Sequence, residues 1–137
     1  ELRRDTRIPP RAGARAILRR RVKNPERGEI WLMDWSPGRG SEQLGKRPSL
    51  IIQTDAANQN PRYPNVIIAA MTSRIRGVPT HVQVVPTKEN GLTELSEIMA
   101  EQIQTASKER LVKRLGKLDD ATMRKVEHAV RLALSMA

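Results

Sequence analysis

Hydrophobic residues in the first half of the chain are grouped into short runs that favour β-strands. In residues 29–35, isoleucine and leucine alternate with tryptophan and methionine, so both faces of a strand carry apolar side chains. Residues 50–52 follow Pro48, whose missing N–H suits the start of a strand. Residues 66–71 are an uninterrupted apolar run of strand length with a β-branched start. The pattern predicts three strands, with a polar connection over residues 55–65 before the third.

The second half of the chain predicts two further strands and a terminal helix. Residues 81–85 alternate as an antiparallel strand, residues 96–105 form another, and residues 107–111 are typical of a single helical turn. Gly116 is a predicted break, and Asp119 suits a helix N-cap. Apolar residues then recur at three- and four-residue spacing: Met123, Val126, Val130 and Leu134. Short strands followed by a helix indicate an α+β fold, a small antiparallel β-barrel with a C-terminal helix.

Composition narrows the class of protein. The chain has 137 residues, which suits one domain, and its lack of cysteine excludes a disulfide scaffold, a cysteine-ligated zinc site and a thiol nucleophile. No apolar run approaches the ~20 residues that a membrane span needs, and no signal-peptide core is present, so we expect a soluble cytoplasmic protein. The two histidines, His81 and His128, lack the spacing of metal ligands, so we expect no metal and no other cofactor.

The net charge of +10 is distributed unevenly and favours a polyanionic partner. Residues 1–26 carry nine basic and three acidic groups and few large apolar side chains, whereas residues 27–137 carry sixteen and twelve. We therefore divide the chain into a basic, disordered extension over residues 1–26 and a folded domain over residues 27–137. The first residue is Glu1 rather than Met, and the extension has two interpretations, a nucleic-acid-binding tail or a vector-derived or upstream-translated segment.

Two polar clusters stand at the ends of predicted strands, where a rigid sheet presents side chains to solvent. The first cluster comprises Ser41, Glu42, Gln43, Lys46 and Arg47, and the second comprises Thr72, Ser73 and Arg74. If the two strand ends are neighbours, an arginine, a carboxylate and hydroxyl groups converge. RNA carries its own nucleophile, the 2′-hydroxyl, so such a set can cleave a phosphodiester by aligning that group, accepting a proton and stabilising charge.

The residue types suggest a role for each member of this set. The planar fork of Arg47 matches phosphate oxygens and, because its pKa is very high, suits charge stabilisation rather than proton donation. Glu42 is the candidate base, and Thr72 is a candidate hydrogen-bond donor to the phosphate or its leaving group. A purely structural reading is also open: Arg47 pairs with a carboxylate and Thr72 closes a turn.

A series of short motifs runs in order along residues 27–135 and ends with the terminal helix. The motifs are Arg27-Gly28-Glu29-Ile30-Trp31 with Asp34 and Pro37, Arg39-Gly40-Ser41-Glu42-Gln43 with Gly45 and Arg47-Pro48, Ile68-Ala69-Ala70-Met71-Thr72-Ser73, Pro79-Thr80-His81-Val82, Gly91-Leu92, Glu101-Gln102-Ile103 and Arg110-Leu111. In these motifs the chain resembles the MazF/PemK family of toxin endoribonucleases of type II toxin–antitoxin systems.

The resemblance implies a specific fold, activity and set of partners. Members of that family are SH3-like, CcdB/PemK-like barrels that form homodimers and are neutralised by an acidic, MazE-like antitoxin peptide. They cleave single-stranded RNA (mRNA) at short sequences without a metal, leaving a 2′,3′-cyclic phosphate and a 5′-hydroxyl. The family's catalytic arginine, threonine and acidic residue fall on Arg47, Thr72 and Glu42. The residues expected to contact RNA are Ser41, Gln43, Lys46, Ser73, Arg74 and Gln102.

Two other functions use the same fold. CcdB-like toxins bind DNA gyrase through a C-terminal tryptophan, whereas this chain ends in Ala137 and both tryptophans lie in the first predicted strand. A non-catalytic RNA-binding module is the other alternative, but only Tyr63 is available as an aromatic platform for stacking bases. The endoribonuclease is therefore the favoured prediction.

Overall fold

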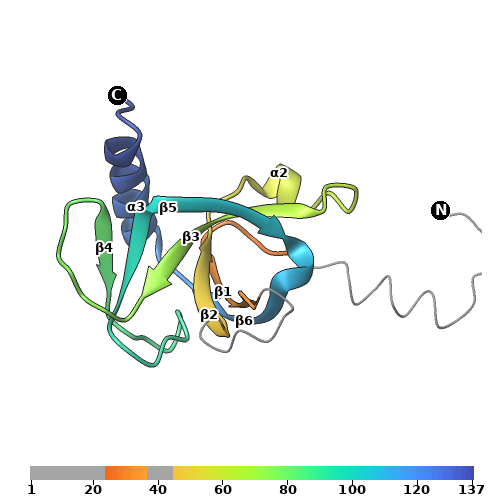
Figure 1. The fold of residues 1–137 in the computed structure, drawn as a ribbon, viewed down its shortest axis with the longest axis horizontal. Helices are drawn as coiled ribbons and strands as arrows, with labels where there is room; N and C mark the ends of the chain where they lie inside the picture. Colours follow the sequence, from red (N-terminus) through yellow and green to blue (C-terminus); the bar gives the residue numbers. More distant parts are fainter. Residues whose placement is uncertain (1–23, 37–44) are drawn as a thin grey trace, which may run out of the picture.

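The computed structural model describes residues 24–36 and 45–137, and six strands within these ranges form one antiparallel sheet (Figure 1). The strands are β1 (Glu29–Asp34), β2 (Lys46–Ile51), β3 (Asn65–Thr72), β4 (His81–Val84), β5 (Ser96–Ser107) and β6 (Leu111–Lys117). The helices are α2 (Asp55–Asn58), the 3₁₀ turn η1 (Lys108–Arg110) and α3 (Asp120–Ala133). The sheet order is β4-β5-β3-β2-β1-β6.

The connection between β5 and β6 forces the sheet to curl. These strands are four places apart in the sheet, which would separate them by about 19 Å if the sheet were flat. The three residues of η1 span at most roughly 14 Å when fully extended. The sheet therefore bends until the end of β5 reaches β6, as the course of these strands in Figure 1 shows. The prediction of a mostly antiparallel β-fold with a C-terminal helix is confirmed.

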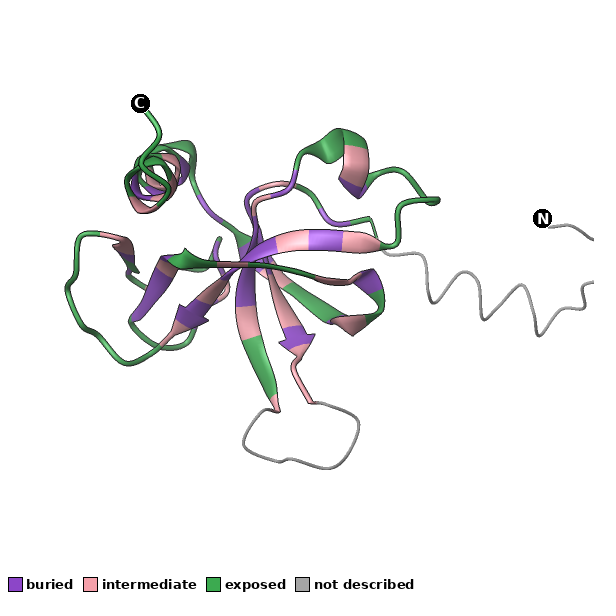
Figure 2. Ribbon diagram, turned by 45° about the horizontal axis from the view of Figure 1, so that its top comes forward, coloured by how far each residue is buried: buried purple, intermediate pink, exposed green. Residues whose placement is uncertain are grey.

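Both faces of the sheet carry a hydrophobic core. Figure 2 marks the buried residues along the strands in purple. The larger core packs α3 and the β4–β5 end of the sheet together, and the smaller one includes Val66, Ile68 and Leu111. Ile30 lies in the larger core and Met33 in the smaller, so β1 is covered on both faces as its alternating pattern predicts. No helix in the described ranges is long and apolar enough to cross a membrane.

The terminal helix begins where the sequence predicts. The Asp119 carboxylate accepts a hydrogen bond from the Thr122 N–H and caps α3. The predicted apolar stripe packs on the sheet through Met123 and Val126. Leu134 is an exception: it follows the last helical residue and is 55% exposed, so the stripe is one turn shorter than expected.

Two elements differ from the sequence-based prediction. Gly116, expected to be a break, lies inside β6. The position needs a glycine because the neighbouring chain passes very close: an added Cβ would be 2.3 Å from the Glu89 carbonyl oxygen. The polar connection over residues 55–65 begins with the short helix α2, whose Asn58 is fully buried and hydrogen-bonded to Gln53. In both elements the chain packs through close backbone contacts or buried amides, which hydrophobic periodicity does not report.

Pro48 lies within β2 rather than at its start. It pairs with Leu32 of β1, but the pairing of β2 with β3 covers only residues 49–51. At Pro48, therefore, β2 has no hydrogen-bonding partner in β3. A sheet tolerates proline at such a position, because no N–H is needed there. The first half of β2 consequently separates from β3.

Candidate active site

The register of the central strands places the two principal candidate residues opposite each other. Ser49 of β2 pairs with Ala70 of β3, and continuing this antiparallel register by two residues sets Arg47 opposite Thr72. Residues directly opposite each other in neighbouring strands point to the same face. Because the ladder stops at Ser49, the strands diverge there and leave space between the two side chains.

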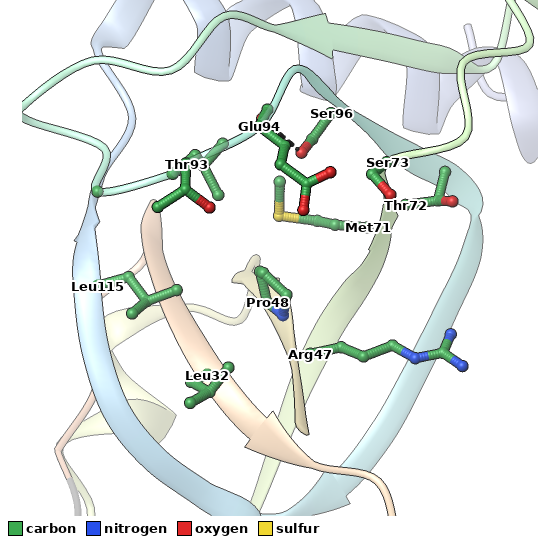
Figure 3. A pocket seen from close by; sticks show the side chains of 12 residues that line it. Leu32, Arg47, Pro48, Met71, Thr72, Ser73, Thr93, Glu94, Ser96 and Leu115 are labelled. Atoms are coloured by element: carbon green, nitrogen blue, oxygen red, sulfur yellow. Dashed lines mark hydrogen bonds between the residues drawn. The ribbon is translucent and has the colours of Figure 1, made fainter. Parts of the chain in front are cut away.

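Both residues line a pocket of about 560 Å³ that is open to solvent (Figure 3). It is lined by Leu32, Arg47, Pro48, Met71, Thr72, Ser73, Gly91, Leu92, Thr93, Glu94, Ser96 and Leu115. Apolar side chains form much of the wall, while the arginine, the hydroxyl groups and one carboxylate supply the polar groups. Figure 3 shows Arg47 and Thr72 extending toward the same side of the pocket. Arg47 and Thr72 thus line one pocket, and their role as a catalytic pair stays a prediction.

The Thr72 hydroxyl has a defined acceptor role and retains its own proton. Its Oγ1 accepts a hydrogen bond from the Arg74 N–H at 3.0 Å, so the side chain closes the turn after β3. A hydroxyl that accepts one such bond still has its O–H to donate. The structural and functional readings of Thr72 are thus compatible, since the same contact that closes the turn fixes the oxygen in the pocket.

The other predicted site residues are dispersed. Ser73 also lines the pocket, whereas exposed Lys46, Arg74 and Gln102 do not belong to its lining. Gln102 lies in β5 where the register with β3 shifts between Met99 and Ile103, so that part of the strand is not paired with β3. Three predicted residues, Ser41, Glu42 and Gln43, lie outside the described residues.

The end of β1 is anchored beside the strand that carries Arg47. Arg110 Nη1 donates to the carbonyl oxygens of Asp34 and Ser36, both at 2.8 Å. Asp34 pairs in turn with Lys46 at the start of β2, and the Trp35 N–H donates to the Gly45 carbonyl. These contacts join η1, β1 and β2, so Arg110 helps to fix the strand start from which Arg47 projects.

An ion-pair cluster, in which Glu97 is buried and Glu101 is exposed, lies on the other side of the site. Glu97 of β5 pairs with Thr72 in the β3–β5 register, and its carboxylate accepts hydrogen bonds from the N–H groups of Arg76 and Gly77. His81 of β4 lies between two carboxylates, with Nδ1 2.7 Å from Glu97 Oε1 and Nε2 2.9 Å from Glu101 Oε2. The cluster therefore holds the chain that leaves β3 after Thr72.

The two carboxylates decide the charge of His81. Burial opposes a charged imidazole, but the hydrogen bonds to Glu101 and Glu97 outweigh it and raise the pKa of His81 above its ordinary value. Burial also opposes the charged form of Glu97 and on its own would raise the pKa of that carboxyl. Hydrogen bonds from the Arg76 N–H, His81 and the Gly77 N–H lower the pKa instead. The His81 imidazolium is the charge state that this arrangement stabilises.

We expect His81 to make stability depend on pH. Because its folded-state pKa is raised, its contribution to the free energy of unfolding is complete below the unfolded value of about 6.5 and is lost as pH rises through the folded value. Urea unfolding measured from about pH 6 to pH 9 should show this decline in the wild type and not in His81→Gln. The matched control is His128→Gln on the exposed face of α3, which should keep the decline. An unchanged decline in His81→Gln would contradict the assignment.

Residues 26–134 match the model of the family described as PemK-like, MazF-like toxin of type II toxin–antitoxin system. The chain is 43% identical over 112 residues to an endoribonuclease MazF of Staphylococcus saprophyticus, covering 80% of this chain and 91% of that protein.

Solved structures give the same picture of the fold. A mycobacterial endoribonuclease in complex with its cognate antitoxin superimposes with a TM-score of 0.67 at 30% identity, over 82% of this chain and 97% of that one. The MazE–MazF structure of Deinococcus radiodurans has a TM-score of 0.70 at 22% identity, over 84% and 99%, and supports the fold alone.

Proposed function

Because this chain belongs to the PemK-like, MazF-like toxin family of type II toxin–antitoxin systems and is a MazF-type endoribonuclease, we propose that it cleaves single-stranded RNA. In the proposed reaction the substrate's own 2′-hydroxyl attacks the phosphate, and no metal takes part. The observation that carries this proposal is the presence of Arg47 and Thr72 in one open pocket. The homology to an endoribonuclease favours this activity over gyrase binding and over RNA binding without cleavage.

In the proposed reaction the 2′-oxygen attacks the adjacent phosphorus atom and the bond from phosphorus to the 5′-oxygen breaks. The proton lost by the 2′-hydroxyl goes to a base, and the departing 5′-oxygen gains a proton, so the products are a 2′,3′-cyclic phosphate and a 5′-hydroxyl. No external water is consumed. The protein has to align the nucleophile, move protons and stabilise the negative charge that builds up on the phosphate oxygens.

The residues in the pocket suit the last of these tasks. In the proposed mechanism, the Arg47 guanidinium binds the non-bridging phosphate oxygens through its planar fork. The Thr72 O–H donates a hydrogen bond to the phosphate or the leaving oxygen. Glu42 is the proposed base and lies outside the described residues. The proposed RNA contacts are serine, lysine, arginine and amide side chains: Ser41, Gln43, Lys46, Ser73, Arg74 and Gln102.

The proposed partners follow from the relatives and from charge. Because a related mycobacterial endoribonuclease forms a complex with its cognate antitoxin, we propose that an acidic antitoxin peptide binds this chain. The folded domain over residues 27–137 has sixteen basic groups against twelve acidic ones, which favours an anionic partner. We also propose that the chain forms a homodimer, as the resemblance implies.

Incubation of the purified protein with a long RNA in excess EDTA tests the proposed chemistry. We expect undiminished cleavage, and mapping of the new ends should find a 5′-hydroxyl on one fragment and a 2′,3′-cyclic phosphate on the other. Inhibition by EDTA that added Mg²⁺ reverses would contradict the metal-independent mechanism. Products with a 5′-phosphate and a 3′-hydroxyl would contradict attack by the 2′-hydroxyl.

A further inference from the structure

One carboxylate in the pocket has no role in the mechanism above. Glu94 projects into the pocket from the segment before β5, on the wall above Met71 and Pro48 (Figure 3). Within the described ranges, no hydrogen bond or ion pair uses its carboxylate group, although Ser96 Oγ donates to its backbone carbonyl at 2.9 Å. An accessible acceptor therefore faces the same cavity as Arg47 and Thr72.

The segment that carries Glu94 is held firmly against the sheet. The Asn90 side chain, 4% exposed, accepts from the N–H groups of Thr87 and Leu92 and donates to the Val85 carbonyl. Gly91 adopts φ +72° and approaches β6 so closely that an added Cβ would be 2.0 Å from the Leu115 carbonyl oxygen. The chain just before Glu94 is thus fixed by packing and by buried hydrogen bonds, while Glu94 itself is exposed.

We propose that Glu94 selects a guanine base next to the scissile phosphate, with the apolar wall of the pocket covering the face of that base. This inference rests on the proposed function, because it assumes that the scissile phosphate of the RNA binds in this pocket at Arg47 and Thr72. It makes Glu94 a specificity-determining residue rather than a catalytic one.

The charges that line the pocket indicate that a base, and not a phosphate, lies beside Glu94. A carboxylate repels the RNA backbone, whereas the cationic Arg47 attracts it, and both line one cavity. The pocket wall below Glu94 includes Met71 and Pro48, which offer an apolar surface and no charge to a phosphate (Figure 3). A flat, largely apolar base with N–H groups along one edge matches both features of that side.

The hydrogen-bonding edge of guanine fits a carboxylate best. Guanine has two adjacent donors on its Watson–Crick edge, N1–H and the N2 amino group, which can bond to both oxygens of a carboxylate. Adenine and cytosine offer one amino group beside an unprotonated ring nitrogen, and uracil offers one N–H between two carbonyl groups. Adenine, cytosine and uracil would therefore each place an acceptor atom opposite the carboxylate, which is unfavourable. We therefore expect guanine to be preferred.

The test compares cleavage sites in a randomised single-stranded RNA pool for the wild type and Glu94→Gln. We expect the wild type to prefer guanine at one position beside the cleaved bond. Glu94→Gln should reduce that preference by about fivefold or more, because one of the two carboxylate oxygens is replaced by an NH2 group, a donor that would face one of the two guanine donors. The readout is a ratio between bases at one position, so a general rise in RNA affinity after loss of a negative charge does not affect it.

The matched control is Glu89→Gln, which removes an exposed carboxylate that does not line this pocket and should leave the base preference unchanged. A wild type that shows no guanine preference, or that prefers another base, overturns the proposal, as does a guanine preference that survives in Glu94→Gln. These results are distinguishable from failure of the proposed function, which would appear as no cleavage, or as products with the wrong ends, in the wild-type protein.

Discussion

Replacing Arg47 by alanine should lower the single-turnover rate of RNA cleavage by a factor of the order of 10² or more. Arg47 lines the same pocket as Thr72, so in the proposed mechanism its guanidinium meets the charge that develops on the phosphate in the transition state. In the proposed complex other basic groups also bind the uncleaved RNA, so its dissociation constant should change far less. Cleavage of a defined RNA and binding to a non-cleavable analogue measure the two quantities separately.

Two further variants make this prediction specific. Arg47→Lys keeps the charge but loses the planar fork, so it should recover only part of the lost rate. Arg62→Ala removes an exposed arginine of the connection before β3, outside the pocket lining, and should retain wild-type cleavage. Equal loss of binding and cleavage in Arg47→Ala would reassign the residue to RNA binding. Unchanged cleavage would remove Arg47 from the site altogether.

The core strands and the terminal helix could be predicted because their patterns are local. Residues 66–71 are apolar on both faces, and β3 occupies the centre of the sheet with neighbours on both sides. Asp119 caps α3 as its side-chain chemistry favours. By contrast, apolar and polar residues alternate only weakly along β6. This strand lies at a sheet edge, where its basic side chains, including Lys113 and Arg114, are exposed. Pattern analysis is least informative for such a strand.

The meeting of Arg47 and Thr72 was predictable from the positions of two polar clusters at strand ends. The remaining features of the site depend on contacts that are distant in sequence. Glu94 enters the pocket only because the chain before β5 folds back beside β6. The pairing of His81 with Glu97 and Glu101 depends on the β4–β5 register, which no local pattern specifies.

The hydrogen bonds of Lys108 show how a buried charge escapes a sequence-based analysis. Its Nζ donates to the carbonyl oxygens of Ala57, Asn58 and Asn60, about fifty residues earlier in the chain. Burial lowers the pKa of Lys108, and the three carbonyls compensate for the lost hydration of the ammonium group. In the sequence this lysine is one of 25 basic residues, and nothing beside it marks it as structural.

The largest effect should come from the substrate rather than from the protein. If the nucleophile is the 2′-hydroxyl, an RNA with a single 2′-deoxy nucleotide immediately 5′ of the scissile phosphate contains no group that can attack that phosphorus atom. We expect this RNA to bind the protein and to remain uncut at the modified bond. The same substitution two nucleotides away should permit cleavage, because the nucleophile at the scissile bond is intact.

The most direct test of the account is therefore the cleavage rate at that one bond, measured with wild-type protein on the 2′-deoxy and unmodified RNAs. We predict that the modified bond stays intact while the unmodified one is cut. Cleavage of both bonds at similar rates would mean that water or a protein side chain attacks the phosphate, and it would contradict the proposed mechanism.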